Sequence, residues 1–243
     1  MNIENLSVRK SDLLRAIIRE FVETALPVGS ATLAERHGFD ISPATIRNEM
    51  SELEAMGLIE QPHTSAGRIP TESGFRIFVN QALSDYESAD KKPLRQKMKI
   101  AAIGNDPESA VKSIAKQVAA EAREAVVVAF SPRHVYYTGL SHLFSQPEFR
   151  EFGRVVRFGE LIDRLDEIME AALDRVRPDI AVWIGSENPF GNSCGTVIAG
   201  CRTSPSSHGA FGVLGPLRMD YERSIALVDT ARSALDELAN RNQ

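Results

Sequence analysis

The chain has 243 residues, of which 43% are hydrophobic, and a formal net charge of −5 at pH 7. This length allows two modest domains with real cores, and the acidic balance argues against a protein that coats nucleic acid through bulk positive charge. Two cysteines are too few for a disulfide framework, and no apolar run resembles a signal peptide or reaches the length of a membrane span. The composition, net charge and cysteine count predict a soluble cytoplasmic protein with no membrane partner.

Residues 1–83 have the pattern of a winged helix-turn-helix. An apolar stripe at helical spacing predicts the first helix, serine and threonine provide caps, and glycine ends two of the helices. Short apolar runs around a glycine-containing turn predict a hairpin. The expected elements are helices over 7–24, 31–37 (with Ser30 as its cap) and 43–56, strands over 57–62 and 68–70, and a helix over 72–83.

A polar stretch, "SDYESADKKP", begins at residue 84 and predicts a domain boundary. We expect a DNA-binding domain over 1–83, a linker and connecting helix over 84–106, and a regulatory or dimerisation domain over 107–243. Helices interleaved with short β-rich runs predict a small α/β domain there, so the fold class is α+β. Its expected elements are helices near 107–123, 160–176 and 221–239, a helical region at 146–152, and strands at 125–130, 134–139, 179–185, 195–200 and 209–215.

The helix that begins at "SPATIRNEM" has one apolar side and one small, polar, nearly uncharged side. Such a face suits the major groove, where Asn48 can pair with an adenine edge, Arg47 with guanine, and small groups can touch a thymine methyl. The alternative is an ordinary solvated helix face. We expect the DNA-contacting residues of this helix and its cap to be Ser42, Ala44, Thr45, Arg47, Asn48 and Ser51.

The hairpin that follows is the predicted wing. Small residues allow its backbone to approach DNA closely, and a cation can bind phosphate or enter the minor groove. The alternative is a solvent-exposed turn without a role. The expected wing contacts are His63, Thr64, Ser65 and Arg68.

Other candidate chemistry is weak. Cys194 with His208 lacks a visible orienting group for nucleophilic catalysis, so a buried strand residue is the better interpretation. Cys194, Cys201 and His208 lack the tight ligand pairs of structural zinc sites. The glycines of "GAFGVLG" do not form a dinucleotide fingerprint. We therefore expect no enzyme activity, no cofactor and no metal.

The segment "PVGSATLAERHGFDISPATIRNEMSELEAMGLIEQPHTSAGRIPTESGFRIFVN" resembles the N-terminal domain of the heat-inducible transcription repressor HrcA family. "YYTGLSHLFSQPEF", "IGSENPF" and "FGVLGPLRMDYERSIALVD" are similar to the family's C-terminal blocks. The resemblance implies a homodimeric repressor of chaperone genes that binds an inverted-repeat operator, the CIRCE element. It also implies a winged helix, a GAF-like domain, an inserted dimerising domain and modulation by the chaperonin GroEL.

One departure concerns the dimer. "AVVVAFSPRH" runs almost directly into "VYYTGLSHLF", where the family has further strands and the inserted domain. We therefore expect a reduced GAF-like regulatory or dimerisation domain, whose dimer does not rely on the inserted domain. The C-terminal helix has an apolar stripe that could contribute to a dimer, although core packing explains it at least as well: Ile225, Val228, Leu235 and Leu238. An alternative function is a winged-helix regulator of another regulon whose GAF-like domain senses a small molecule.

Overall fold

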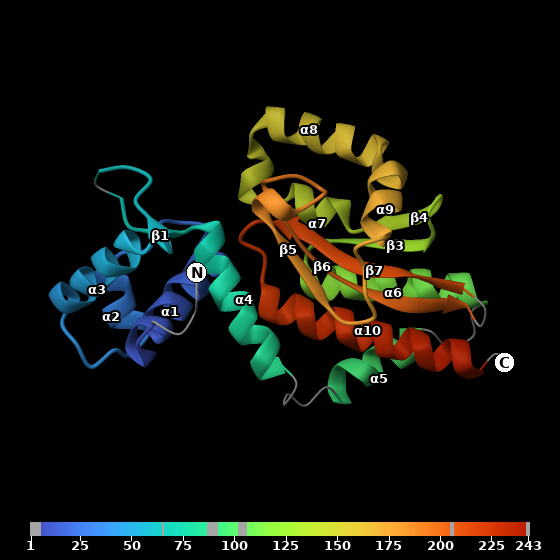
Figure 1. The fold of residues 1–243 in the computed structure, drawn as a ribbon, viewed down its shortest axis with the longest axis horizontal. Coiled ribbons are helices and arrows are strands. Elements are labelled where there is room, and N and C mark those ends of the chain that lie inside the picture. The colour runs from blue at the N-terminus through green and yellow to red at the C-terminus, as the bar shows by residue number, and fades with distance from the viewer. Residues whose placement is uncertain (1–5, 65, 87–91, 102–105, 205–206, 242–243) are drawn as a thin grey trace. The chain divides into compact units, whose positions relative to one another are not determined.

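The computed structural model describes residues 6–64, 66–86, 92–101, 106–204 and 207–241. The chain divides into two compact units, residues 1–84 and 85–243, which are described separately below (Figure 1). Among the described residues, no helix is long and apolar enough to cross a membrane.

The first unit is a winged helix-turn-helix, as predicted. Its core consists of side chains that repeat at helical spacing on α1, α3 and α4, such as Ile17, Ile46 and Phe75, all fully buried. One predicted cap is wrong: Gly29 caps α2 and Ser30 is its first residue. The elements are α1 (Val8–Thr24), α2 (Ser30–Arg36), α3 (Pro43–Ala55), β1 (Ile59–Glu60), β2 (Ile69–Pro70) and α4 (Glu72–Tyr86).

The second unit is built on a five-stranded antiparallel sheet in the order β4-β3-β7-β6-β5. The strands are β3 (Ala125–Ser131), β4 (His134–Thr138), β5 (Ala181–Ile184), β6 (Cys194–Ser204) and β7 (Ser207–Pro216). The helices are α5 (Lys92–Ala101), α6 (Pro107–Ala122), α7 (Leu140–Phe144), α8 (Phe152–Asp163), α9 (Leu165–Leu173) and α10 (Tyr221–Arg241), with short 3₁₀ turns η2 (Pro147–Arg150) and η3 (Gly185–Glu187).

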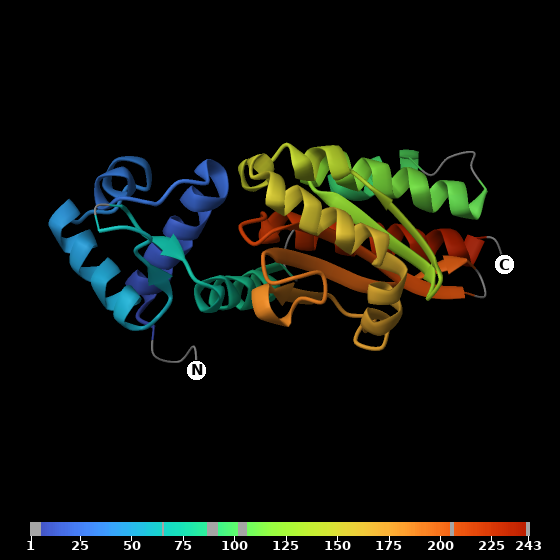
Figure 2. The same ribbon diagram turned by 90° about the horizontal axis from the view of Figure 1, so that it is seen from above.

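Both faces of this sheet are covered. Successive residues of β3 point to opposite faces, and all from Ala125 to Ala129 are buried, which explains the continuous apolar run in the sequence. Ala125, Val127 and Ala129 face the core beneath α7, α8 and α9. The helices α6 and α10 pack on the opposite face (Figure 1), and α8 and α9 lie in front of the strands when seen from above (Figure 2).

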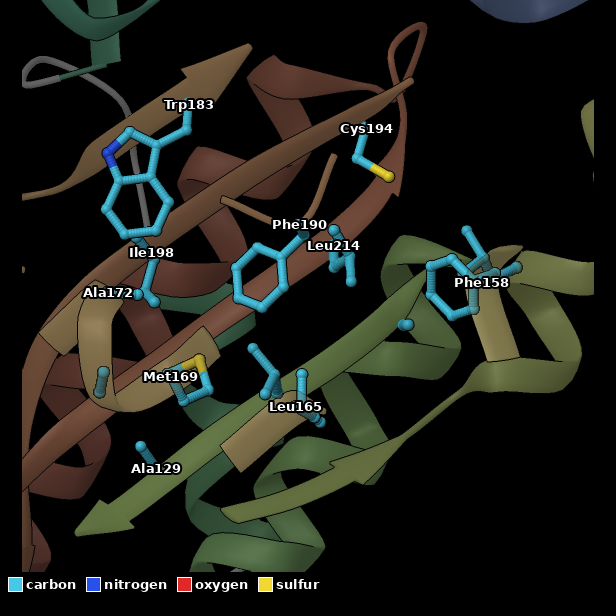
Figure 3. Close-up of a cluster of buried hydrophobic side chains, with 14 residues drawn as sticks. Ala129, Phe158, Leu165, Met169, Ala172, Trp183, Phe190, Cys194, Ile198 and Leu214 are labelled. Carbon is cyan, nitrogen blue, oxygen red and sulfur yellow. The ribbon is translucent and has the colours of Figure 1, made fainter. Parts of the chain in front are cut away.

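The predicted helix over 160–176 is wrong in its bounds. The chain instead forms α8 and α9, which are separated at Arg164, where the backbone leaves the helical region (φ −115°, ψ 19°). The break changes the chain direction so that Phe158 on α8 and Leu165 and Met169 on α9 all reach the same core (Figure 3). The five-residue α7 was not predicted, because it is too short to show a hydrophobic period.

The apolar stripe of α10 belongs to the unit's own core. Ile225, Val228 and Leu235 are at most 1% exposed, and α10 packs on β6 and α6. Core packing therefore explains these three residues of the stripe, whereas Leu238 is half-buried.

Candidate nucleic-acid interface

The helix α3 begins where the sequence predicts. The Ser42 hydroxyl accepts a hydrogen bond from the Thr45 amide at 3.2 Å, and Pro43 occupies the first helical turn. Both features satisfy or remove free amides at the helix start. The buried side of the helix is held by Ile46, Met50 and Leu53, as expected.

The opposite side of α3 is open to solvent. Ala44, Arg47, Asn48 and Ser51 are exposed, and Thr45 is half-buried. The Ser51 hydroxyl donates to the Arg47 backbone carbonyl at 3.1 Å, but among the described residues neither the Arg47 guanidinium nor the Asn48 side-chain amide has a hydrogen-bond or ion-pair partner. Their polar groups are therefore available to a ligand without the breaking of an internal contact.

The acidic residues of α3 are paired with cations from elsewhere in the unit. Glu49 is 5% exposed and forms an ion pair with Arg9. Glu52 pairs with Lys10 at 2.6 Å, and the hydrogen bond from Lys10 holds the pKa of Glu52 below its ordinary value. Sequence analysis did not predict the α1 partners of these acids or the burial of Glu49.

The wing consists of β1, β2 and the segment between them. Ile59 pairs with Pro70 and Glu60 with Ile69. The Gln61 side-chain amide donates to the carbonyls of Thr64 (3.1 Å) and Ala66 (2.9 Å), which fixes the turn. Sequence analysis missed this role of Gln61.

A third segment strengthens the wing. Val28 and Arg68 form a β-bridge with two backbone hydrogen bonds of 2.8 and 2.9 Å. Gly67 makes this approach possible, because a Cβ at that position would lie 2.4 Å from the Val28 carbonyl oxygen. The Arg68 guanidinium binds Glu54 of α3 at 2.9–3.0 Å. The predicted phosphate-binding cation is therefore held in an ion pair between wing and helix.

Helix and wing enclose a polar cleft of about 400 Å³. Arg47, Thr64 and Arg68 all line it, so the structure brings together predicted residues of both elements. Asn48 and Ser51 lie on the exposed helix face, and His63 is exposed near the tip of the wing, none of them in the cleft. The predicted contact Ser65 lies outside the described residues.

The cysteine chemistry considered above is not supported. Cys194 is buried at the start of β6, and burial raises the pKa of its thiol to about 11. Burial likewise raises the pKa of Cys201 to about 12. Neither thiol supplies thiolate near neutral pH. Among the described residues, no group of three His, Cys, Asp or Glu side chains is placed to hold a metal ion.

Two of the C-terminal sequence blocks have structural roles in the second unit. Asn188 of "IGSENPF" is buried, donates to the Cys194 carbonyl at 2.9 Å, and accepts from the Phe190 amide at 3.0 Å. Arg218 of "RMDY" is 8% exposed and donates to Gln146 and Glu148 of the segment around η2. These residues fix the loop between β5 and β6 and the entry to α10.

Two family models match the chain. The model described as "Winged helix-turn-helix transcription repressor, HrcA DNA-binding" matches residues 5–84. The model described as "HrcA protein C terminal domain" matches residues 72–225, which is more than half of the chain.

The chain is similar to several proteins named "Heat-inducible transcription repressor HrcA". The protein of Natranaerobius thermophilus is 29% identical over 325 aligned positions, which cover 92% of this chain and 94% of that protein. That of Parafrankia sp. is 59% identical over 76 residues, or 31% of this chain and 22% of that protein. Because 325 positions exceed the 243 residues here, the Natranaerobius protein contains residues without a counterpart in this chain.

A crystal structure described as a hypothetical protein shares the fold. The TM-score is 0.78 at 18% sequence identity, and the match covers 98% of this chain and all of that one. At this level of sequence identity, the similarity is evidence for the fold alone.

Proposed function

This chain belongs to the HrcA family, and we propose that it is a heat-inducible transcription repressor that binds an inverted-repeat operator of the CIRCE type as a homodimer. The family's winged-helix domain is present, and its geometry supports DNA binding by α3 and the wing. The proposal places this repressor in the cytoplasm, with chaperone genes as its targets.

One observation supports the assignment of base contacts to α3. Arg47 and Asn48 lie near the N-terminal end of an exposed helix face, and their side chains have no partner among the described residues. A helix presented in this way fits the major groove, where Arg can bind guanine and Asn adenine in bidentate fashion. Ala44, Thr45 and Ser51 are small enough to let the helix approach the bases.

The wing supports a different kind of contact. His63 and Thr64 are exposed at its tip, and Arg68 lines the cleft beside Arg47. We assign these residues to the DNA backbone, together with Ser42 at the start of α3 and Ser65. Backbone contacts position the protein and make binding sensitive to salt, whereas base contacts supply sequence preference.

The two-fold operator requires two copies of the domain, because each recognition helix reads one half-site. The homodimer and a modulating contact with the chaperonin GroEL are proposals that rest on the family resemblance. Sedimentation analysis of the free protein and of its operator complex tests the first. A strictly monomeric protein that binds a half-site as tightly as the full repeat would refute it.

The central test is a gel shift with a CIRCE duplex and a scrambled duplex of equal length, with and without GroEL. We expect Arg47→Ala and Asn48→Ala each to lower operator affinity by about 5- to 150-fold, which corresponds to roughly 1–3 kcal/mol per bidentate contact. Affinity for the scrambled duplex should change far less for Asn48→Ala. Arg133→Ala is the matched control, since Arg133 is an exposed arginine in the second unit. Unchanged operator affinity in both α3 variants would overturn the base-reading role.

A further inference from the structure

A pocket in the second unit shares no lining residue with the cleft between α3 and the wing. Its volume is about 430 Å³, within the range of small-molecule sites. One wall is a single face of α8, where Arg154, Phe158 and Leu161 follow helical spacing. The other wall is the loop from Pro189 to Cys194, between β5 and β6.

The inner part of the pocket is apolar. Phe149, Phe158 and Phe190 contribute aromatic surface, and Phe158 and Phe190 are at most 4% exposed. Figure 3 shows Phe158, Phe190 and Cys194 among the buried side chains of this region. Because burial raises the pKa of Cys194 to about 11, its thiol is neutral and acts as part of the apolar lining.

Hydrogen bonds within the protein hold the loop wall and the lining residue Glu148 in place. Asn188 holds the loop through hydrogen bonds to the Cys194 carbonyl and from the Phe190 amide. Arg218 holds Glu148, which lines the pocket, through paired hydrogen bonds. A preformed site loses little conformational entropy on binding.

Three arginines and two glutamates contribute charge to the lining of the pocket. Arg154 and Arg157 line it from α8 and Arg164 from the break that follows this helix, and Arg157 has no ion-pair partner among the described residues. Arg154 and Arg164 pair with exposed glutamates, and such surface pairs contribute little and exchange readily. Of the two lining carboxylates, Glu148 is compensated by Arg218, and Glu160 is exposed at the rim.

We propose that this pocket binds a small amphipathic carboxylate, with its hydrocarbon or aromatic body against the phenylalanines and its carboxylate at Arg157. An apolar floor beneath arginine donors matches such a ligand in both shape and charge. A neutral molecule of the same size would fill the floor and leave the arginine without a counter-ion.

Calorimetric titration of the whole protein with matched ligand pairs tests the proposal. The probes are 4-phenylbutyrate and decanoate, each compared with its alcohol, 4-phenylbutanol and decanol. We expect each carboxylate to bind at least about tenfold more tightly than its alcohol, as a charge-assisted pairing with arginine predicts. Equal affinities would overturn the carboxylate assignment, and no binding of any probe would overturn the site.

Two variants locate the binding. Arg157→Gln should reduce carboxylate affinity by about five- to tenfold and leave alcohol affinity unchanged, because it removes charge and keeps a polar side chain. Arg150→Gln is the control, since Arg150 is exposed on η2 and does not line the pocket. The emission of Trp183 reports whether the unit remains folded. Equal losses in both variants, or no loss in Arg157→Gln, would refute the location.

Discussion

Glu124 is a buried carboxyl group whose removal should stabilise the second unit. The residue is 5% exposed and directly precedes β3, and its Oε2 atom has no hydrogen-bond partner among the described residues. Burial raises the pKa of this carboxyl to about 9. The positive charge of Arg218 lowers the pKa, whereas the negative charges of Glu148 and Asp220 raise it further. The group is therefore protonated in the folded protein at pH 7.

The expected stability change follows from proton linkage. An unfolded chain ionises this group near its ordinary value of 4.5, so between pH 4.5 and 9 the folded chain holds one additional proton. The free energy of unfolding then falls as pH rises, by about 1.4 kcal/mol per pH unit from this group alone. From pH 6.0 to 8.5 the loss amounts to about 3 kcal/mol. Glu124→Gln keeps the shape, removes the titration and should abolish this loss.

Urea unfolding at pH 6.0, 7.25 and 8.5 measures the effect. Trp183, the single tryptophan of the chain, lies buried in β5 and reports on this unit. The stability advantage of Glu124→Gln over the natural protein should grow by about 3 kcal/mol between the two extremes of pH. The control Glu170→Gln changes an exposed glutamate on α9 and should leave the pH profile unaltered. A Glu124→Gln advantage that is the same at all three pH values would refute the argument.

Three further predictions concern the wing and the β5–β6 loop. Glu54→Gln releases Arg68 from its ion pair, so the affinity for the operator duplex and for the scrambled duplex should both rise. The plot of log binding constant against log salt concentration should become steeper by about one phosphate contact, and a shallower slope would contradict this. Gly67→Ala places a Cβ against the Val28 carbonyl, so it should lower the midpoint temperature at which the unit of residues 1–84 unfolds and weaken binding to every duplex. An unchanged midpoint temperature would argue against the close approach. Asn188→Ala removes the hydrogen bonds that hold Cys194 and Phe190, so urea unfolding should show that the free energy of unfolding falls by about 2–4 kcal/mol. A fall of less than about 1 kcal/mol would show that the loop does not depend on Asn188.

The sequence predicted the elements whose pattern is local. The buried side of α3 follows from the period of Ile46, Met50 and Leu53, and its start follows from Ser42 and Pro43. The strands β3, β6 and β7 were visible as apolar runs bounded by turns. Their order in the sheet was not predictable, because several antiparallel pairings of the five strands satisfy the same local pattern.

The features that sequence analysis missed depend on contacts between distant residues. No local pattern links Glu54 to Arg68, or Val28 to Arg68, since 14 residues and 40 residues separate the partners. The break at Arg164 likewise arises because α8 and α9 must both reach one core. The residue types at the proposed DNA-binding face were therefore predictable from the sequence. Which charged side chains form ion pairs with one another was not.

The pairing of charges resolves how an acidic domain can present a DNA-binding face. Residues 1–83 contain eight Lys or Arg against eleven Asp or Glu, so a count of charges alone predicts repulsion from phosphate. On α3, however, Glu49, Glu52 and Glu54 are each paired with a cation, while Arg47 has no partner among the described residues. The potential that a duplex meets depends on this local arrangement, because screening limits each charge to about 8–10 Å. Pairing thus leaves α3 with one uncompensated positive charge, on the face that the proposed function assigns to the bases.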